Sequence, residues 1–120
     1  MKIVVLAILA VAIIYAAVHG LPAQDNARAI EIHARRFEFV PAEITVKKGE
    51  AVTLSLISDD VSHSLLIEGL GVNQTIVKGH VVQVTFTPDK IGDFPGRCGR
   101  FCGNGHGTMR FLVHVTEQKP

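Results

Sequence analysis

The chain has 120 residues, with 12 Lys and Arg against 11 Asp and Glu and a formal net charge of +1. A chain of this length supports one domain. The nearly balanced charge, with no run of Lys and Arg along the sequence, argues against a nucleic-acid-binding protein.

An apolar run occupies the N-terminus. It extends from Ile3 to Val18 behind a single basic residue, Lys2. As a helix it would measure about 24 Å, and with the next three residues it approaches the roughly 30 Å core of a bilayer. Leu21-Pro22-Ala23 is a mediocre cleavage site, so residues 1–21 are expected to form an uncleaved membrane anchor rather than a cleaved signal peptide. Either reading places the remainder outside the cytoplasm. A buried core helix is the weakest reading, because the run is apolar all round.

A polar segment, residues 22–29, reads as a linker, and residues 30–120 carry the alternating pattern of β-strands. The alternating segments are, in chain order, 30–35, 44–46, 52–56, 63–67, 82–86 and 110–115. Turn signals rich in Gly, Lys and Pro separate them. No helical periodicity follows Ala29, so the sequence predicts an all-β sandwich.

Residues 97–109 depart from the strand pattern. They supply two thiols, Cys98 and Cys102, an imidazole, His106, and a thioether, Met109. The glycines between them suit a tight loop whose side chains converge. Thiolate, imidazole and thioether together favour copper over hard cations. The sequence therefore predicts a copper site on a loop between two strands.

A second imidazole is expected from His63, which begins a strand and shares a face with Leu65 and Ile67. A mononuclear blue-copper site needs only one thiolate. The extra Cys98 allows two sulfurs to bridge two copper ions, with Met109 and a backbone carbonyl near Arg100 as weak ligands. Three alternatives stay open, namely a disulfide, a mononuclear carrier with Cys98 spare, and a copper chaperone with exchangeable metal. The remaining histidines are read as surface or flanking residues: His19, His33, His80 and His114.

The loop resembles the copper domain of cytochrome c oxidase subunit II, a member of the cupredoxin superfamily. That family's CuA loop runs Cys-x3-Cys-x3-His-x2-Met, and this chain reads Cys98-x3-Cys102-x3-His106-x2-Met109. Upstream, Asp60-Val61-Ser62-His63-Ser64 resembles the family's Asp-Val-x-His-Ser. The segment 92–98 resembles its approach to the loop, and 39–49 its first strands. The resemblance covers about residues 35–115.

The resemblance implies a cupredoxin-like Greek-key sandwich or barrel holding two copper ions. Its implied ligands are His63, Cys98, the backbone carbonyl of Arg100, Cys102, His106 and Met109. It implies transfer of single electrons from a donor such as a c-type cytochrome towards a haem-copper oxidase with a haem-bearing large subunit. The expected location is the periplasmic or extracytoplasmic face of a membrane. No nucleophile is paired with a base, so no catalytic machinery is expected in the chain itself.

Three features depart from that family. Many members carry Glu where this chain has Arg100, and that Glu serves a magnesium site which Arg cannot form. The chain has no Trp, so the family's aromatic route for electrons from cytochrome c is not carried over. Many members have two membrane helices, whereas this sequence offers at most one candidate.

Overall fold

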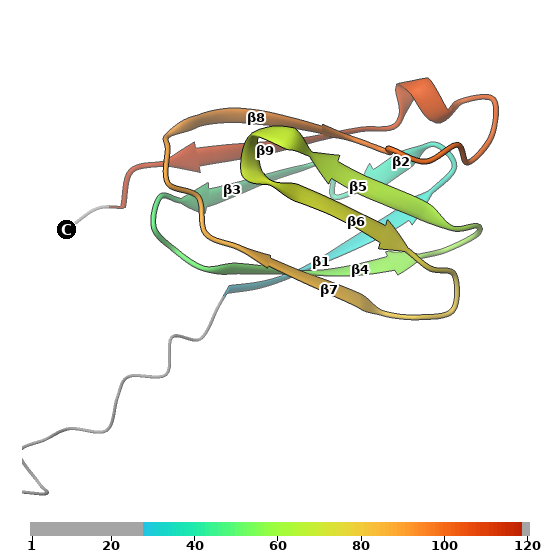
Figure 1. Cartoon of the computed structure of the whole chain (residues 1–120), viewed down its shortest axis with the longest axis horizontal. Coiled ribbons are helices and arrows are strands. Elements are labelled where there is room, and N and C mark those ends of the chain that lie inside the picture. The colour runs from blue at the N-terminus through green and yellow to red at the C-terminus, as the bar shows by residue number, and fades with distance from the viewer. Residues whose placement is uncertain (1–27, 119–120) are drawn as a thin grey trace, which may run out of the picture.

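A computed structural model describes residues 28–118 and shows two β-sheets packed face to face (Figure 1). The described strands are β1 (Arg28–Arg35), β2 (Glu38–Val40), β3 (Glu43–Lys47), β4 (Val52–Ser58), β5 (His63–Ile67), β6 (Val72–Ile76), β7 (Val82–Phe86), β8 (Gly92–Arg97) and β9 (Arg110–Thr116). Two short 3-10 helices, η1 (Glu68–Leu70) and η2 (His106–Thr108), interrupt them. The all-β sandwich predicted from the alternating pattern is confirmed.

The predicted N-terminal helix over residues 1–21 lies outside the described residues. Among the residues that are described, no helix has the length and apolarity needed to span a bilayer.

The two sheets have non-sequential strand orders. One runs β2-β1-β4-β7 and the other β3-β9-β8-β5-β6. The pairs β1–β4 and β3–β9 are parallel, and the remaining pairs are antiparallel. Because β2 and β3 follow one another but belong to different sheets, the chain crosses between the layers early.

Three strands lacked a clear sequence signal. The strand β2 is only three residues long. In β6 only the two end residues, Val72 and Ile76, are buried, so its middle reads as polar. The strand β8 has the sequence GDFPGR, whose Gly and Pro normally argue against a strand interior.

The core lies between the sheets, where the apolar residue of each alternating pair points inward. Val52, Leu54 and Leu56 of β4 are fully buried and face Val113 of β9 and its neighbours across the sandwich. Burial of each such side chain contributes about 1.5–3 kcal/mol. Phe39 and Phe111 come from opposite sheets and meet edge to face, with ring centroids 5.7 Å apart. This packing makes the two sheets one rigid support.

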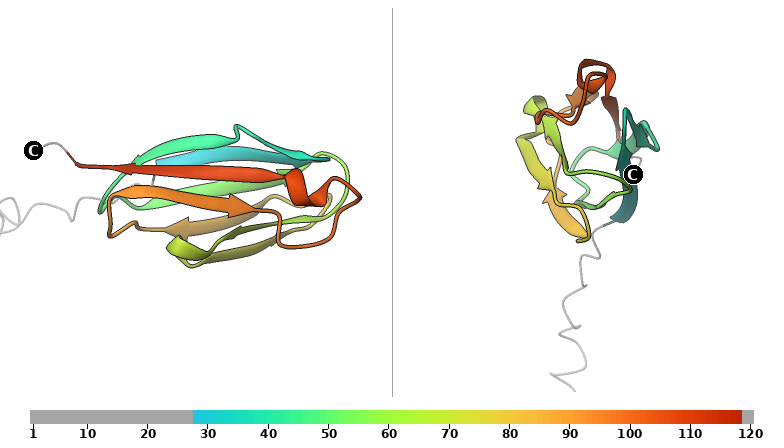
Figure 2. Two further views of the ribbon diagram at one scale, coloured as in Figure 1. Left: turned by 90° about the horizontal axis from the view of Figure 1, so that it is seen from above. Right: turned by 90° about the vertical axis from the view of Figure 1, so that its right-hand side faces the viewer.

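One end of the sandwich carries the segment between β8 and β9, including η2 (Figure 2). The turn between β1 and β2 and the start of β5 lie at the same end (Figure 1). We call this the loop end. Residues that are distant in sequence therefore converge beside the predicted ligands.

Candidate metal centre

The segment from Cys98 to Met109 is a closed loop rather than an open connection. The backbone N–H of Cys98 donates to the carbonyl of Met109 at 3.2 Å, which ties the two stems together. Within the loop, His106 N–H donates to Gly103 at 3.1 Å and starts η2. Gly103 has a φ of 140°, a conformation that side chains other than Gly rarely adopt. The turn directs His106 and Met109 back towards the thiols.

The two thiols lie at the centre of this loop. Their sulfur atoms are 3.8 Å apart, far beyond the roughly 2.05 Å of a disulfide, and both cysteines are free and buried. The Cys98 thiol donates to the carbonyl of Arg100 at 3.1 Å. The Cys102 sulfur lies 3.8 Å from Nδ1 of His106 and 4.0 Å from Sδ of Met109. Three of the six predicted ligand groups thus surround the sulfur pair, which supplies two more.

The sixth group, His63, reaches the same point from β5. It is fully buried, and one ligand atom each from His63, Cys98 and Cys102 lie within 4.8 Å of one another. Its Nε2 lies 2.7 Å from Oδ1 of Asp60, whereas its buried Nδ1 has no hydrogen-bond partner among the described residues. A buried imidazole nitrogen without a partner is costly unless it binds something. This orphaned nitrogen beside two free thiols fits a soft metal ion.

Asp60 fixes which nitrogen of His63 is available. Burial acts to raise the pKa of Asp60, but hydrogen bonds from the backbone of Arg36, from His63 and from the backbone of Val61 lower that pKa to about 2. The carboxylate is therefore ionised and accepts a hydrogen bond from the N–H at Nε2 of His63. The lone pair of the imidazole is then at Nδ1.

The Cys102 thiol holds its proton when no metal ion is bound. Burial, followed by the hydrogen bond and charge of Cys98, raises the pKa of Cys102 to about 11, and the positive charge of Arg36 opposes this only in part. Cys102 would therefore have to lose this proton in order to ligate a metal ion, whose positive charge would stabilise the thiolate.

The β1–β2 turn supports the loop from the opposite sheet. Nε of Arg36 donates to the carbonyl of Cys102 at 2.8 Å. The ring of Phe37 packs on Gly103 and Gly105, and a Cβ added to Gly105 would overlap that ring. We call Arg36 and Phe37 the loop brace. On the β5 side, the hydroxyl of Ser64 accepts the N–H of Gly99 at 2.9 Å.

The comparisons with known proteins agree with this architecture. A family model described as a Cupredoxin-like domain matches residues 4–109. The chain belongs to the cupredoxin-like family.

Relatives of this cupredoxin include several oxidase subunits, which confirms the predicted resemblance. Cytochrome c oxidase subunit 2 of Thermus thermophilus is 29% identical over 92 residues, covering 77% of this chain and 68% of the relative. The same subunit of Cereibacter sphaeroides is 32% identical over 93 residues, covering 75% and 31%. A probable subunit 2 of Streptomyces coelicolor is 38% identical over 70 residues, covering 58% and 22%. The cupredoxin thus spans between about a fifth and two thirds of these relatives.

Solved structures share the fold at lower sequence identity. The periplasmic domain of subunit II of cytochrome oxidase from Bradyrhizobium japonicum has a TM-score of 0.69 at 18% identity, covering 75% of this chain and 84% of that one. Auracyanin A, a "blue" copper protein from Chloroflexus aurantiacus, has a TM-score of 0.61 at 17% identity, covering 73% and 98%. The cupredoxin-like sandwich predicted from the resemblance is confirmed.

The predicted ligands of this cupredoxin differ in exposure. The side chains of His63, Cys98, Cys102 and Met109 are buried, and His106 is only half-buried. His33 and His114 lie on outer faces against carboxylates, and His80 is exposed in the β6–β7 turn. Sequence reasoning missed the loop brace, because neither Arg36 nor Phe37 stands in a recognisable motif. Asp60 was noticed only as part of the resemblance to the oxidase subunit.

Proposed function

We propose that this domain carries single electrons through a binuclear copper centre of the CuA type. Its ligands would be His63, Cys98, the backbone carbonyl of Arg100, Cys102, His106 and Met109. The observation that carries the proposal is the buried His63, which has an orphaned Nδ1 and places a ring nitrogen within 4.8 Å of two free buried thiols. The relatives named cytochrome c oxidase subunit 2 support it.

The residues around the centre suit fast electron transfer. When bound, a thiolate-bridged copper pair supplies a one-electron couple whose charge is shared between two metal ions. The protein holds the ligands in place before and after transfer, since Asp60 orients His63 and the loop brace fixes Cys102. The buried ligands exclude water, so little rearrangement accompanies a change in charge.

Partners and location follow from the relatives and are part of the proposal. The domain would receive electrons from a donor such as a c-type cytochrome and pass them to the haem-bearing large subunit of a haem-copper oxidase. It would work at the extracytoplasmic face, anchored by residues 1–21. Arg100 replaces the Glu that would serve a magnesium site, so no magnesium ion is proposed.

The burial of the candidate ligands favours electron transfer over copper delivery. A chaperone must exchange its metal and therefore exposes its ligands, whereas Cys98 is 1%, Cys102 5% and Met109 0% exposed. The second thiol favours a binuclear centre over a mononuclear carrier, because the sulfur of Cys98 lies beside that of Cys102 rather than in solvent.

The test is copper content together with electron paramagnetic resonance. The purified chain, reduced and loaded with copper, should hold two ions, turn purple and show hyperfine structure from one electron shared by two copper nuclei. One copper with the pattern of a single nucleus would support a blue-copper carrier instead. Loosely held Cu(I) without a visible charge-transfer band would support a chaperone. If a disulfide between the two cysteines forms again after reduction and prevents tight copper binding, all three copper-binding functions are refuted.

A further inference from the structure

Arginines that are scattered along the sequence gather at the loop end of the sandwich. Arg36 contacts the loop through Cys102, Arg100 lies between the two thiols, and Arg110 directly follows Met109. Arg35 is the last residue of β1 and directly precedes Arg36, and Arg97 directly precedes Cys98. All five side chains are exposed. The sequence shows no basic cluster because these residues are spread over some 75 positions.

The acidic residues at this end already have partners. Asp60 is bound to His63, and Asp59 lies 2.7 Å from His33 and 3.7 Å from Arg35. Glu38 pairs with Arg35 at 2.9 Å. Glu38 and Asp59 therefore offset the charge of Arg35 rather than that of the other arginines at this end.

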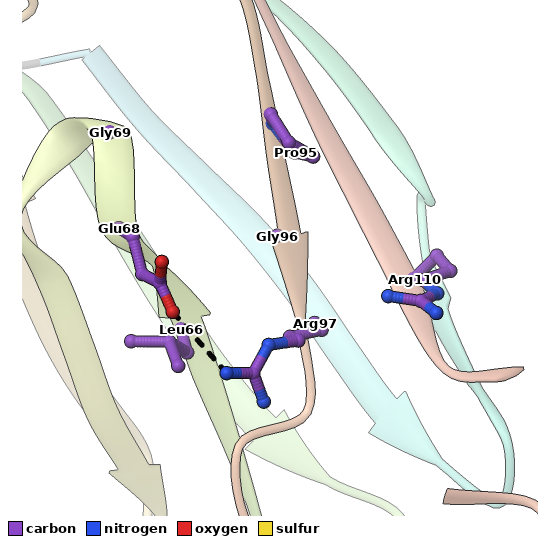
Figure 3. Close-up of a pocket in the computed structure, with 7 residues that line it drawn as sticks. All are labelled: Leu66, Glu68, Gly69, Pro95, Gly96, Arg97 and Arg110. Atoms are coloured by element: carbon purple, nitrogen blue, oxygen red, sulfur yellow. Dashed lines mark hydrogen bonds and ion pairs between the residues drawn. The ribbon is translucent and has the colours of Figure 1, made fainter. Parts of the chain in front are cut away.

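The excess of positive charge extends onto the outer face of β8 and β9. Arg97 donates to Glu68 at 3.3 Å, while Arg110 stands on the neighbouring strand without joining that pair (Figure 3). Among the residues that the structure describes, the guanidinium groups of Arg36, Arg100 and Arg110 have no carboxylate within 4.0 Å, although the backbone N–H of Arg36 donates to Asp60. Three uncompensated guanidinium groups therefore lie around the loop.

An apolar side chain projects among these charges. Phe101 is 73% exposed, the largest exposed fraction among the large apolar residues described. Its ring centroid lies 6.0 Å from that of His106, the least buried of the side chains that are candidate ligands. Phe101, Arg36 and Arg100 line an open pocket of about 340 Å³ together with Cys102. Exposed aromatic and arginine side chains are enriched at protein–protein contacts.

We propose that the loop end is a docking surface for an acidic redox protein, one that presents Asp and Glu side chains around the exposed edge of its cofactor. Phe101 forms the apolar centre of the contact, and Arg36, Arg100 and Arg110 form its basic rim. That the partner is a redox protein rests on the proposed electron-transfer function. Charge complementarity of this kind steers association and fixes orientation. The basic rim would also attract an anionic membrane. The rim surrounds the candidate metal centre, however, and this position favours a redox protein as the partner.

The test uses one cytochrome in two charge states. Mitochondrial cytochrome c is basic, and succinylation converts its lysines to carboxylates while retaining the haem. Binding of both forms to the copper-free full-length chain in neutral detergent is measured by calorimetry at low ionic strength. The succinylated form should bind and lose affinity as salt is raised through about 0.15 M, because screening weakens exposed charge pairs. Tighter binding of the unmodified basic form would overturn the proposal.

Matched variants locate the surface. Arg100→Gln with Arg110→Gln should weaken binding of the succinylated cytochrome about five- to twentyfold at low salt. The double variant Lys47→Gln with Lys48→Gln also removes two positive charges, but at the opposite end of the sandwich, where β3 ends. It should leave the affinity unchanged. Equal loss in both double variants would mean non-specific attraction and would refute the site. Because the Arg100 substitution lies inside the loop, Arg110→Gln alone is measured as well, and circular dichroism checks each fold.

The apolar centre and the membrane alternative have their own readouts. Phe101→Ser should weaken binding without changing its salt dependence, whereas the arginine variants should reduce that dependence. Vesicles of phosphatidylglycerol that bind more tightly than the succinylated cytochrome, with the same sensitivity to the arginine variants, would replace the protein partner by a membrane. Since the binding assay needs no copper, its outcome is independent of the copper and resonance measurements. Either proposal can therefore fail while the other stands.

Discussion

The thiols of Cys98 and Cys102 make different contacts, although their spacing suggests equivalent roles. Cys102 lies within 4.0 Å of His106 Nδ1 and Met109 Sδ, and the loop brace holds its carbonyl. Cys98 contacts the Arg100 carbonyl and the other sulfur. Cys102 is therefore the more central donor of the pair.

Substitution of each thiol should separate these roles. Cys98→Ser should abolish the signal of an electron shared by two copper nuclei and leave a folded protein with one copper. Cys102→Ser should reduce copper binding further, because it removes the donor next to both His106 and Met109. Copper content and electron paramagnetic resonance measure both effects. An unchanged two-copper spectrum in Cys98→Ser would contradict the bridging role.

Asp60 contacts His63, and we expect it to influence copper binding through that imidazole rather than by contact with the metal. Asp60→Asn replaces a carboxylate acceptor by an amide, so the imidazole is held less firmly in the tautomer with Nδ1 free. Copper affinity should fall about 10–100-fold, as measured by competition with a chelator. Asp59→Asn is the matched control, since Asp59 contacts His33 and Arg35 and should leave the affinity unchanged. Equal losses of copper affinity in the two variants would mean that the loss of any nearby negative charge weakens binding, and that Asp60 has no specific role.

At the scale of elements, the loop depends on a turn from the other sheet. The brace contact between Arg36 and Cys102 joins residues 66 positions apart. Phe37 fills the space that a side chain at Gly105 would need. The loop thus keeps its shape because β1 and β2 present that turn to it.

Gly105→Ala tests this contact. The φ of Gly105 is −92°, which Ala adopts readily, so any effect comes from overlap with Phe37. We expect a loss of about 1–3 kcal/mol in the free energy of unfolding, measured by denaturant titration of the copper-free protein. Gly107→Ala is the control, because an added Cβ there meets nothing within 4 Å. Adding Phe37→Ala to Gly105→Ala should recover part of the lost free energy of unfolding. If the double variant recovers none of it, the strain does not come from overlap with Phe37.

The same element shows where sequence reasoning ends. The spacing of Cys98, Cys102, His106 and Met109 is local, so one loop could be predicted to bring them together. His63 could be added because a strand pattern and a resemblance both pointed to it. The brace and the arginine cluster depend on contacts between distant segments, which no periodicity encodes. The strand β8 was missed for a related reason, because neighbours on both sides stabilise a Gly- and Pro-containing segment.

At the scale of the molecule, His114 joins three strands of the larger sheet. From β9 it reaches Asp93 of β8 at 2.6 Å and Glu43 of β3 at 3.2 Å. The hydrogen bonds to Asp93 and then to Glu43 raise the pKa of His114 above its usual 6.5, against a smaller effect of burial.

This arrangement predicts a pH-dependent contribution to stability. A raised folded-state pKa means that the contribution is complete below the unfolded value of 6.5 and is lost as pH rises through the folded value. The difference in Tm between the wild type and His114→Gln should therefore be largest near pH 5.5 and shrink towards about pH 9. His80→Gln, at an exposed turn, should show no such trend. A difference that grows with pH would contradict the assigned charge pairs.

The parallel pairing of β3 with β9 also has a consequence for synthesis of the domain. Among the strands that the structure describes, residues 43–47 pair only with residues 112–116, so nearly the whole domain must be synthesised before the larger sheet can close. Pairings of such separation form slowly compared with local ones. The nascent polypeptide should thus remain open and sensitive to proteases until its final strand emerges.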